Sequence, residues 1–196
     1  SVVKTTGFTG KIRISFPEGP QDSSGPVRID AGSISTKPLP NGTKLTGFTS
    51  SMVSQISTGA GEQILDLGNI AGLNAVSGAD DDILIAGAGN QTLAGGDGND
   101  KYIFEGSWGD DTVTETQAGG TGDTIEFEPI TSIAATIDVY SSVAAAGPQG
   151  VQIVGTTATA NKITNAKFIE KIVGGDQTNV YRFHDDWGYL PSTATA

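Results

Sequence analysis

The sequence predicts an all-β, or nearly all-β, protein in which a short parallel β-roll is flanked by antiparallel strand and hairpin elements. Three observations lead to this fold class. Glycine is abundant, with 28 residues in a chain of 196, twice the usual share of about 7%. In the middle of the chain glycine recurs with a nine-residue period. Segments on either side of that region alternate apolar and polar residues, as half-buried strands do.

Residues 1–67 are expected to form a strand-rich spacer unit. Residues 11–16 (KIRISF) alternate apolar and polar side chains and predict a strand. A loop that contains glycine and proline follows, and residues 26–30 (PVRID) predict a second short strand. A polar stretch then leads to the apolar segment 68–76. The unit is therefore expected to lead directly into the glycine-rich region.

Residues 68–127 are expected to form the β-roll, because consecutive blocks of nine residues share one pattern. The blocks are SGADDDILI (77–85), AGAGNQTLA (86–94) and GGDGNDKYI (95–103), and after a slip of two residues GSWGDDTVT (106–114). The second place holds glycine in the first three blocks. The sixth place holds Asp82, Gln91 and Asp100, and the eighth holds Leu84, Leu93 and Tyr102. Six glycine-rich residues make a tight turn, and three residues then make a short strand.

Residues 128–196 are expected to form a second spacer unit that ends in a degenerate, truncated repeat. Residues 136–141 (TIDVYS) and 150–154 (GVQIV) predict strands, and an apolar segment follows at 166–173. The block 174–188 (GGDQTNVYRFHDDWG) matches 95–109 (GGDGNDKYIFEGSWG) at an offset of 79 residues. The later copy has Asn179 in place of the sixth-place aspartate.

The nine-residue blocks follow the glycine-rich nonapeptide G-G-x-G-x-D-x-U-x, and GGDGNDKYI fits every specified place. The segment resembles the RTX, or haemolysin-type calcium-binding, family, and in particular the repeat modules of very large secreted bacterial RTX proteins and adhesins. The resemblance implies a roll in which two nonapeptides complete one coil, so that residues two blocks apart stack on the same side. It also implies calcium (Ca²⁺) as the cofactor, because stacked carboxylates and turn carbonyls supply the oxygen ligands that calcium takes.

Asp82 and Asp100 are 18 residues apart and are the expected carboxylates of one complete calcium site. Further oxygens of this site are expected from the turn residues Gly78, Ala79, Asp80, Gly96 and Gly98. The opposite edge would carry Leu73, Gln91 and Asp111, where the neutral oxygen of Gln91 would make a weaker site. We expect one good calcium site, or two or three, rather than a long ladder. The alternative is that these are unmetallated glycine turns of a decayed repeat.

Acidic residues are concentrated in the same part of the chain. The net charge is −11, and between Leu45 and Asn161 there are fifteen acidic residues and one basic residue, Lys101. Such an excess of like charge opposes a compact state unless cations neutralise it; a solvated acidic surface is the alternative. The negative charge argues against nucleic acid as a partner. The absence of cysteine excludes a cysteine-ligated zinc site. No apolar run approaches the length of about 18 residues that a membrane span needs.

The expected function is that of a calcium-binding structural module of a secreted or cell-surface RTX-type protein. By resemblance, it would fold or stiffen on calcium binding after export and would serve adhesion, with a cell-surface glycan or protein as a further partner. We expect no enzymatic activity, because no G-x-S-x-G or H-E-x-x-H motif is present and His184 has no identifiable nucleophile. The chain is expected to be part of a longer protein, because the second copy stops just after Gly188.

Two other functions stay open at this point. One is an ancillary RTX domain of a secreted enzyme whose catalytic residues lie elsewhere in the chain. The other is a carbohydrate-binding module. Its sugar-stacking face would be built from the aromatic residues that the two copies share, namely Tyr102, Phe104, Trp108, Tyr181, Phe183 and Trp187. Because their spacing is the same in both copies, packing in a core is the favoured interpretation.

Overall fold

The computed structural model describes residues 12–16, 27–30, 42–44, 53–127 without 69, 88, 107, 117 and 118, 135–140, 150–155, 162–164, 166, 168–174 and 180–183. These residues form strands and turns and no helix. The strands are β1 (Ile12–Phe16), β2 (Val27–Asp30), β3 (Gly42–Lys44), β4 (Val53–Thr58), β5 (Gln63–Asp66), β6 (Asn74–Ala79), β7 (Ile83–Ile85), β8 (Thr92–Asp97), β9 (Lys101–Phe104), β10 (Asp110–Thr114), β11 (Thr124–Phe127), β12 (Ala135–Tyr140), β13 (Gly150–Gly155), β14 (Lys162–Thr164), β15 (Lys171–Val173) and β16 (Val180–Phe183).

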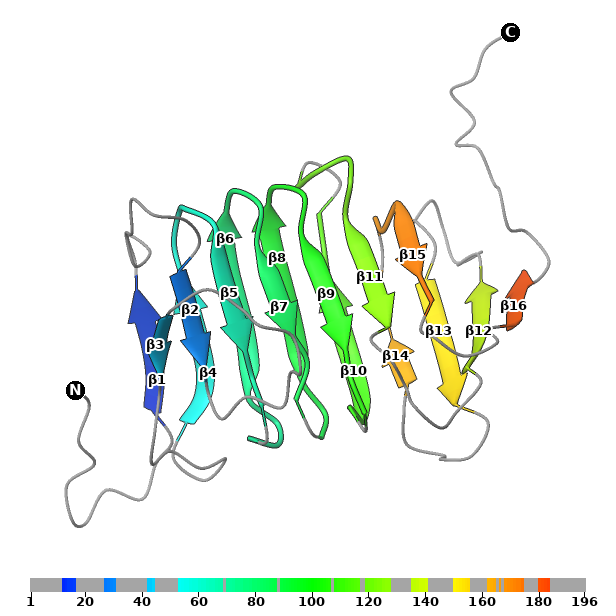
Figure 1. The fold of residues 1–196 in the computed structure, drawn as a ribbon, viewed down its shortest axis with the longest axis horizontal. Helices are drawn as coiled ribbons and strands as arrows, with labels where there is room; N and C mark the ends of the chain where they lie inside the picture. Colours follow the sequence, from blue (N-terminus) through cyan, green and yellow to red (C-terminus); the bar gives the residue numbers. More distant parts are fainter. Residues whose placement is uncertain are drawn as a thin grey trace, which may run out of the picture.

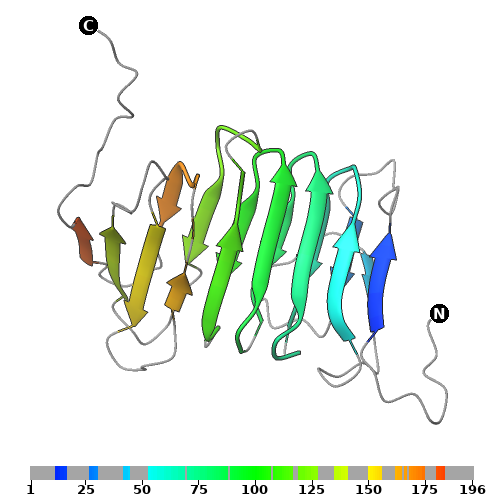
Figure 2. The ribbon, with the colours of Figure 1, turned by 180° about the vertical axis from the view of Figure 1, so that it is seen from behind.

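Two parallel sheets face each other and form a β-solenoid (Figure 1, Figure 2). One sheet has the strand order β1-β4-β6-β8-β10-β14, and the other has the order β15-β11-β9-β7-β5-β2-β3. From β4 to β11 the chain passes alternately from one sheet to the other, so each coil contributes one strand to each sheet. The predicted fold class, an all-β protein built around a parallel β-roll, is confirmed.

The eighth place of each nonapeptide faces the space between the two sheets. Along one sheet the residues in this row are Leu65, Leu84, Tyr102 and Ile125, which pair in register. Along the other sheet they are Ile56, Ala75, Leu93 and Val113. All of them are buried in one hydrophobic cluster. Because burial of apolar area is the main stabilising contribution, this double row holds the coils together and places the glycine-rich turns at the edges.

Aromatic residues extend the same core at the far end of β9 and β11. The ring centroids of Phe104 and Trp108 are 5.7 Å apart, and that of Trp108 is 5.7 Å from that of Phe127. Tyr102, Phe104 and Trp108 are at most 1% exposed, so these three side chains are not a surface for stacking sugars. Tyr181 is 40% exposed. The side chains of Phe183 and Trp187 lie outside the described residues.

Gly96 illustrates why the turns between the sheets require glycine. Its φ of 117° lies in a region that side chains with a Cβ rarely adopt. A Cβ atom at this position would also collide with the backbone oxygen of Gly78 in the preceding coil. The two glycines pair in register across β6 and β8. Successive turns can therefore approach to the strand spacing of about 4.8 Å, which brings the acidic residues of neighbouring turns together.

The predicted flanking strands are present as β1, β2, β12 and β13, and β12 pairs antiparallel with β13 as expected. The expectation of antiparallel pairing is wrong, however, for the described strands before the roll and for the other described strands after it, since β14, β15 and β16 all pair parallel with their neighbours. Before the roll, β1 pairs parallel with β4, and β2 pairs parallel with both β5 and β3. The physical reason is that an alternating pattern specifies which face of a strand is buried, and it does not specify the direction of the neighbouring strand.

Candidate metal centre

A ladder of acidic side chains runs along one edge of the solenoid, where each turn enters a strand of the second sheet. Asp82 Oδ1 accepts a hydrogen bond from the backbone N–H of Gln63 at 2.7 Å. Asp100 Oδ1 accepts one from Asp82 N–H, and Asp123 Oδ1 accepts one from Asp100 N–H, both at 2.8 Å. In the last step of the ladder, Asp123 N–H donates a hydrogen bond to Glu170 Oε2 at 2.9 Å. Each carboxylate thus reaches back to the preceding coil and fixes its position.

The second carboxylate oxygen of each of these three aspartates has no such partner. Asp82 and Asp100 are 1% exposed and Asp123 is fully buried. In each of them Oδ2 is buried without a hydrogen bond among the described residues. A buried carboxylate oxygen without a partner is strongly unfavourable. A proton, a cation or an ordered water molecule at this edge would supply the missing partner.

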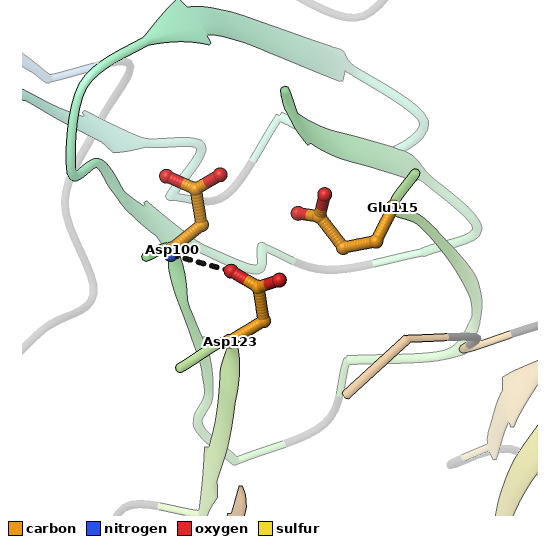
Figure 3. Close-up of side chains that lie close together, drawn as sticks. All are labelled: Asp100, Glu115 and Asp123. Atoms are coloured by element: carbon orange, nitrogen blue, oxygen red, sulfur yellow. Dashed lines mark hydrogen bonds between the residues drawn. The ribbon is translucent and has the colours of Figure 1, made fainter. Parts of the chain in front are cut away.

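Three carboxylates from different parts of two coils converge on one point (Figure 3). Asp100 immediately precedes β9, Glu115 immediately follows β10, and Asp123 immediately precedes β11. One oxygen of each lies within 4.8 Å of the others. Two oxygens on opposite sides of one calcium ion, each at about 2.3–2.6 Å from it, would be about 5 Å apart. The spacing of this acidic triad therefore fits a single ion.

Gly95 and Tyr102 complete the wall of the acidic triad. A Cβ atom on Gly95 would collide with Asp100 Oδ2, Glu115 Oε1 and the Tyr102 hydroxyl, so glycine leaves the space that the carboxylates occupy. The Tyr102 hydroxyl donates a hydrogen bond to Glu115 Oε1 and accepts one from Gly95 N–H at 2.7 Å. Glu115 Oε2 remains without a partner among the described residues. Glu115 is thus held by one oxygen and has the other available to an ion.

Burial changes the protonation of these groups in the metal-free chain. Burial, with added repulsion from neighbouring carboxylates, raises the pKa of Asp82 to about 7, that of Asp100 to about 6 and that of Glu115 to about 7. Burial also raises the pKa of Asp123, to which the charge of Glu170 contributes. All of these groups hold protons more tightly than ordinary carboxyls because burial disfavours their charged form. A bound divalent cation would reverse that preference.

The structure brings together the turn residues that were expected around Asp82 and Asp100. Gly78 pairs with Gly96 and Ala79 with Asp97, and the backbone oxygen of Asp80 lies directly against Gly98. The carboxylate of Asp80 does not turn toward Asp100. It is exposed, and its Oδ2 accepts a hydrogen bond from Gly61 N–H in the preceding coil at 2.9 Å.

Asp111 lies on the opposite edge of the roll, as the stacking pattern predicts. Its Oδ1 accepts a hydrogen bond from Gln91 N–H at 2.8 Å, and Leu73 is buried in the core before them. Burial raises the pKa of Asp111 to about 8. The neutral oxygen of Gln91 accepts a hydrogen bond from Gly87 N–H at 2.9 Å. The sixth places of this edge therefore contribute the carboxylate of Asp111, whose pKa is also raised by the neighbouring charge of Asp110. Asp111 is not part of the acidic triad.

Two members of the triad, Asp123 and Glu115, are not among the site residues that the sequence predicts. Asp123 follows a shortened nonapeptide, GGTG-D-T-I-E, in which one residue is missing between Gly122 and Asp123. Ile125 pairs with Tyr102 and so occupies the eighth place, which puts Asp123 at the sixth place. Glu115 matches no place that the nonapeptide specifies, so the motif gives no signal for it. Asn179 and His184 of the later copy lie outside the described residues.

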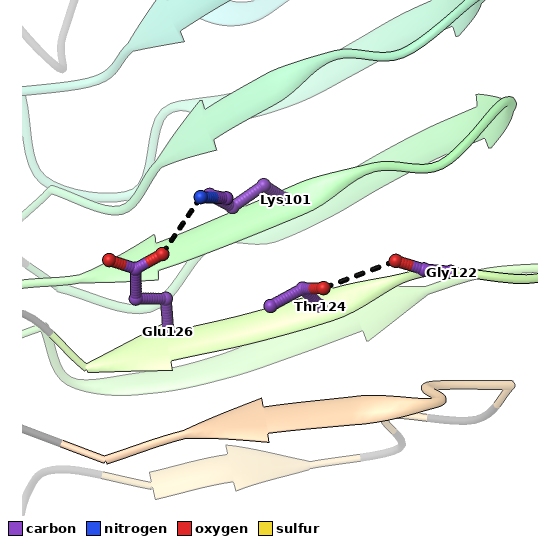
Figure 4. A network of polar contacts seen from close by, with 4 residues as sticks. All are labelled: Lys101, Gly122, Thr124 and Glu126. Atoms are coloured by element: carbon purple, nitrogen blue, oxygen red, sulfur yellow. Dashed lines mark hydrogen bonds and ion pairs between the residues drawn. The ribbon is translucent and has the colours of Figure 1, made fainter.

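Lys101, the single base of the acidic stretch, pairs with an acid outside the triad (Figure 4). Its ammonium group forms an ion pair with Glu126 at 2.9 Å between β9 and β11, and both side chains are partly exposed. In the same view Thr124 donates a hydrogen bond to the backbone oxygen of Gly122 at 3.1 Å, which closes the turn before β11. The charge of Lys101 is therefore held in a surface pair.

No protein-family model, curated protein or solved structure matches this chain. In the part of the chain that the structure describes, no helix has the length and apolarity of a membrane span.

Proposed function

We propose that this chain is a calcium-binding structural module, and that the acidic triad of Asp100, Glu115 and Asp123 is its principal ion site. The observation that carries the proposal is the row of buried carboxylate oxygens without hydrogen-bond partners along one edge. The resemblance of the nonapeptides to the RTX family supports the same function. Asp82 shares the ladder with Asp100 and would provide a neighbouring site of the kind that the spacing predicts.

The donor atoms favour calcium over other ions. The triad offers oxygen alone, which suits hard cations rather than zinc or copper. Calcium accepts irregular arrangements of about six to eight oxygens, whereas magnesium requires a nearly ideal octahedron and gives up its water reluctantly. Three carboxylates from two successive coils, together with nearby turn carbonyls, fit calcium, because its coordination geometry is less strict than that of magnesium.

An ion in the triad would join neighbouring coils of the solenoid. Asp100 belongs to the turn between β8 and β9, whereas Glu115 and Asp123 belong to the next coil. Because calcium would bind the stacked coils and not the unfolded chain, it would stabilise the fold by about 2.7 kcal/mol at a concentration 100 times its Kd. Such a module would stiffen after export into calcium-rich surroundings, and we propose that it serves a secreted or cell-surface RTX-type protein in adhesion.

The test is a calorimetric titration of the chelator-treated protein with calcium, followed by thermal unfolding with and without the ion. We expect binding in the range of about 10⁻⁴–10⁻³ M or tighter and a higher unfolding temperature in calcium. Asp100→Asn should weaken binding at least tenfold, because Asp100 belongs both to the triad and to the pair with Asp82.

Asp97→Asn is the matched control, since it removes the same charge from the same turn at an exposed position. It should leave binding within about twofold of the unmodified chain, because the Asp97 carboxylate is exposed and is not one of the three that converge on the ion site. The absence of binding at millimolar calcium would overturn the proposal. Equal affinity of the Asp97→Asn and Asp100→Asn variants would overturn the assignment of the site.

A further inference from the structure

The coil before the acidic ladder has a glutamine in the position that aspartate occupies in the next coils. Residues 58–66 (TGAGEQILD) form a nonapeptide turn and strand in register with residues 77–85, since Ile64 pairs with Ile83 and Leu65 with Leu84. Gln63 is therefore the counterpart of Asp82. It is fully buried at the start of β5.

The side chain of Gln63 bonds to its own turn through both ends of its amide. Its Nε2 donates to the backbone oxygen of Ala60 at 3.1 Å and to the backbone oxygen of Gly61. Its Oε1 accepts a hydrogen bond from the Thr58 hydroxyl at 2.7 Å. Asp82, its counterpart in the next coil, has instead a buried Oδ2 without a partner. The amide N–H groups thus bond to the turn carbonyl oxygens, which would coordinate the cation in a turn that holds one.

We propose that the Gln63 amide takes the place of a cation, so that the coil of β4 and β5 is closed without metal and serves as the metal-independent start of the acidic ladder. The ladder begins at this residue, because Gln63 N–H holds Asp82 Oδ1. The inference rests on the proposed calcium function for the turns that follow. The inference adds that a turn with glutamine at the sixth place binds no ion, whereas a turn with aspartate there can bind one.

Gln91, at the sixth place on the opposite edge, supports the same rule independently. It is buried, its Oε1 accepts a hydrogen bond from Gly87 N–H at 2.9 Å, and its Nε2 lies 3.5 Å from the backbone oxygen of Ile70. Its amide therefore bonds to a backbone N–H of its own turn and, at the limit of hydrogen-bond distance, to a backbone oxygen of the preceding coil. Both buried glutamines at sixth places have their polar atoms engaged within the protein.

The test converts the amide to a carboxylate with Gln63→Asp. The variant should bind one calcium ion more than the unmodified chain by calorimetry. In chelator it should unfold at least about 5 °C lower, because a charge is now buried without a partner, and millimolar calcium should restore that loss. Gln55→Asp is the matched control, since it makes the same change in β4, where Gln55 Nε2 donates to Ser57 Oγ rather than to turn carbonyls. It should add no ion.

Gln63→Ala separates this inference from the calcium function itself. It removes the amide without adding a charge, so it should lower the unfolding temperature equally in chelator and in calcium. An unchanged temperature in chelator would overturn the inference, as would a Gln63→Asp variant that gains no ion or stays unfolded in calcium. If the unmodified chain binds no calcium, the proposed function fails, and the result for Gln63→Ala in chelator still decides whether Gln63 closes its turn.

Discussion

Tyr102 links the apolar core to the candidate metal centre. In neighbouring coils the same inward row holds leucine or isoleucine, which fill the core without a polar atom. Tyr102 fills the same space, is fully buried, and extends its hydroxyl to Glu115 and to the N–H of Gly95. The hydroxyl satisfies two groups that have no access to water. One side chain therefore contributes both to packing and to the orientation of a proposed ligand.

Tyr102→Phe removes only that hydroxyl and is expected to destabilise the protein by about 1–3 kcal/mol, the cost of leaving buried polar groups unpaired. It should also weaken calcium binding, because Glu115 loses the hydrogen bond that orients it. Urea unfolding in calcium and calorimetric titration measure the two effects. Tyr181→Phe makes the same chemical change at an exposed tyrosine and should alter neither. Equal stability of the two variants would show that the Tyr102 hydroxyl has no structural role.

The sequence predicts two residues of the acidic ladder, because only one step of the ladder has the regular spacing of the repeat. Asp82 and Asp100 are separated by 18 residues, the distance that two regular nonapeptides produce. The step from Gln63 to Asp82 is 19 residues, and the step from Asp100 to Asp123 is 23. Turns absorb such insertions while the strands keep their register. A fixed period therefore cannot identify Gln63, Asp123 or the non-motif Glu115.

At the level of strands, the eighth-place residues are the most predictable feature of the fold. Leu84, Leu93 and Tyr102 recur with the nine-residue period in the sequence, and all three are buried in the shared core. The nine-residue period does not show where the two sheets begin and end. β1 and β2 continue the two sheets without a glycine nonapeptide, because parallel neighbours require only a matching buried face.

Leu84→Ala tests the stack of strands directly. Leu84 is fully buried between Leu65 and Tyr102, so the cavity should cost about 2–5 kcal/mol of unfolding free energy. Val76→Ala, at a side chain that is 36% exposed in β6, should cost less than about 1 kcal/mol. Denaturant unfolding in calcium provides both values. A similar cost at the two positions would contradict the assignment of the eighth place to the core.

Across the whole molecule, the acidic ladder adds a hydrogen bond to each interface between successive coils from β5 to β11. Stability in a solenoid is close to a sum of coil and interface contributions. Here each step of the ladder crosses one interface, from Gln63 through Asp82 and Asp100 to Asp123. A cation in the triad would therefore strengthen an interface rather than a single coil. In its absence the net charge of −11 opposes compaction.

This coupling predicts that the metal-free protein loses stability as the pH rises, and that calcium removes this loss. Burial raises the pKa of Asp100 to about 6 and those of Asp82 and Glu115 to about 7. An acid with a higher pKa in the folded state binds its proton more tightly there, so protonation favours folding. The contribution is complete below the ordinary carboxyl pKa of about 4 and is lost as the pH rises through about 6 to 7. The metal-free protein should therefore become less stable from about pH 5 to about pH 8.

Calcium should remove that loss, because the ion replaces the protons and binds the ionised carboxylates more tightly as the pH rises. The measurement is the thermal unfolding midpoint across this pH range, for metal-free protein and for protein in millimolar calcium. A variant that combines Asp100→Asn, Glu115→Gln and Asp123→Asn resembles the protonated state. At about pH 8 it should exceed the unmodified metal-free chain in stability and gain little from calcium. A metal-free midpoint that rises with pH would contradict this account, since the triad would then be ionised and stabilised without an ion.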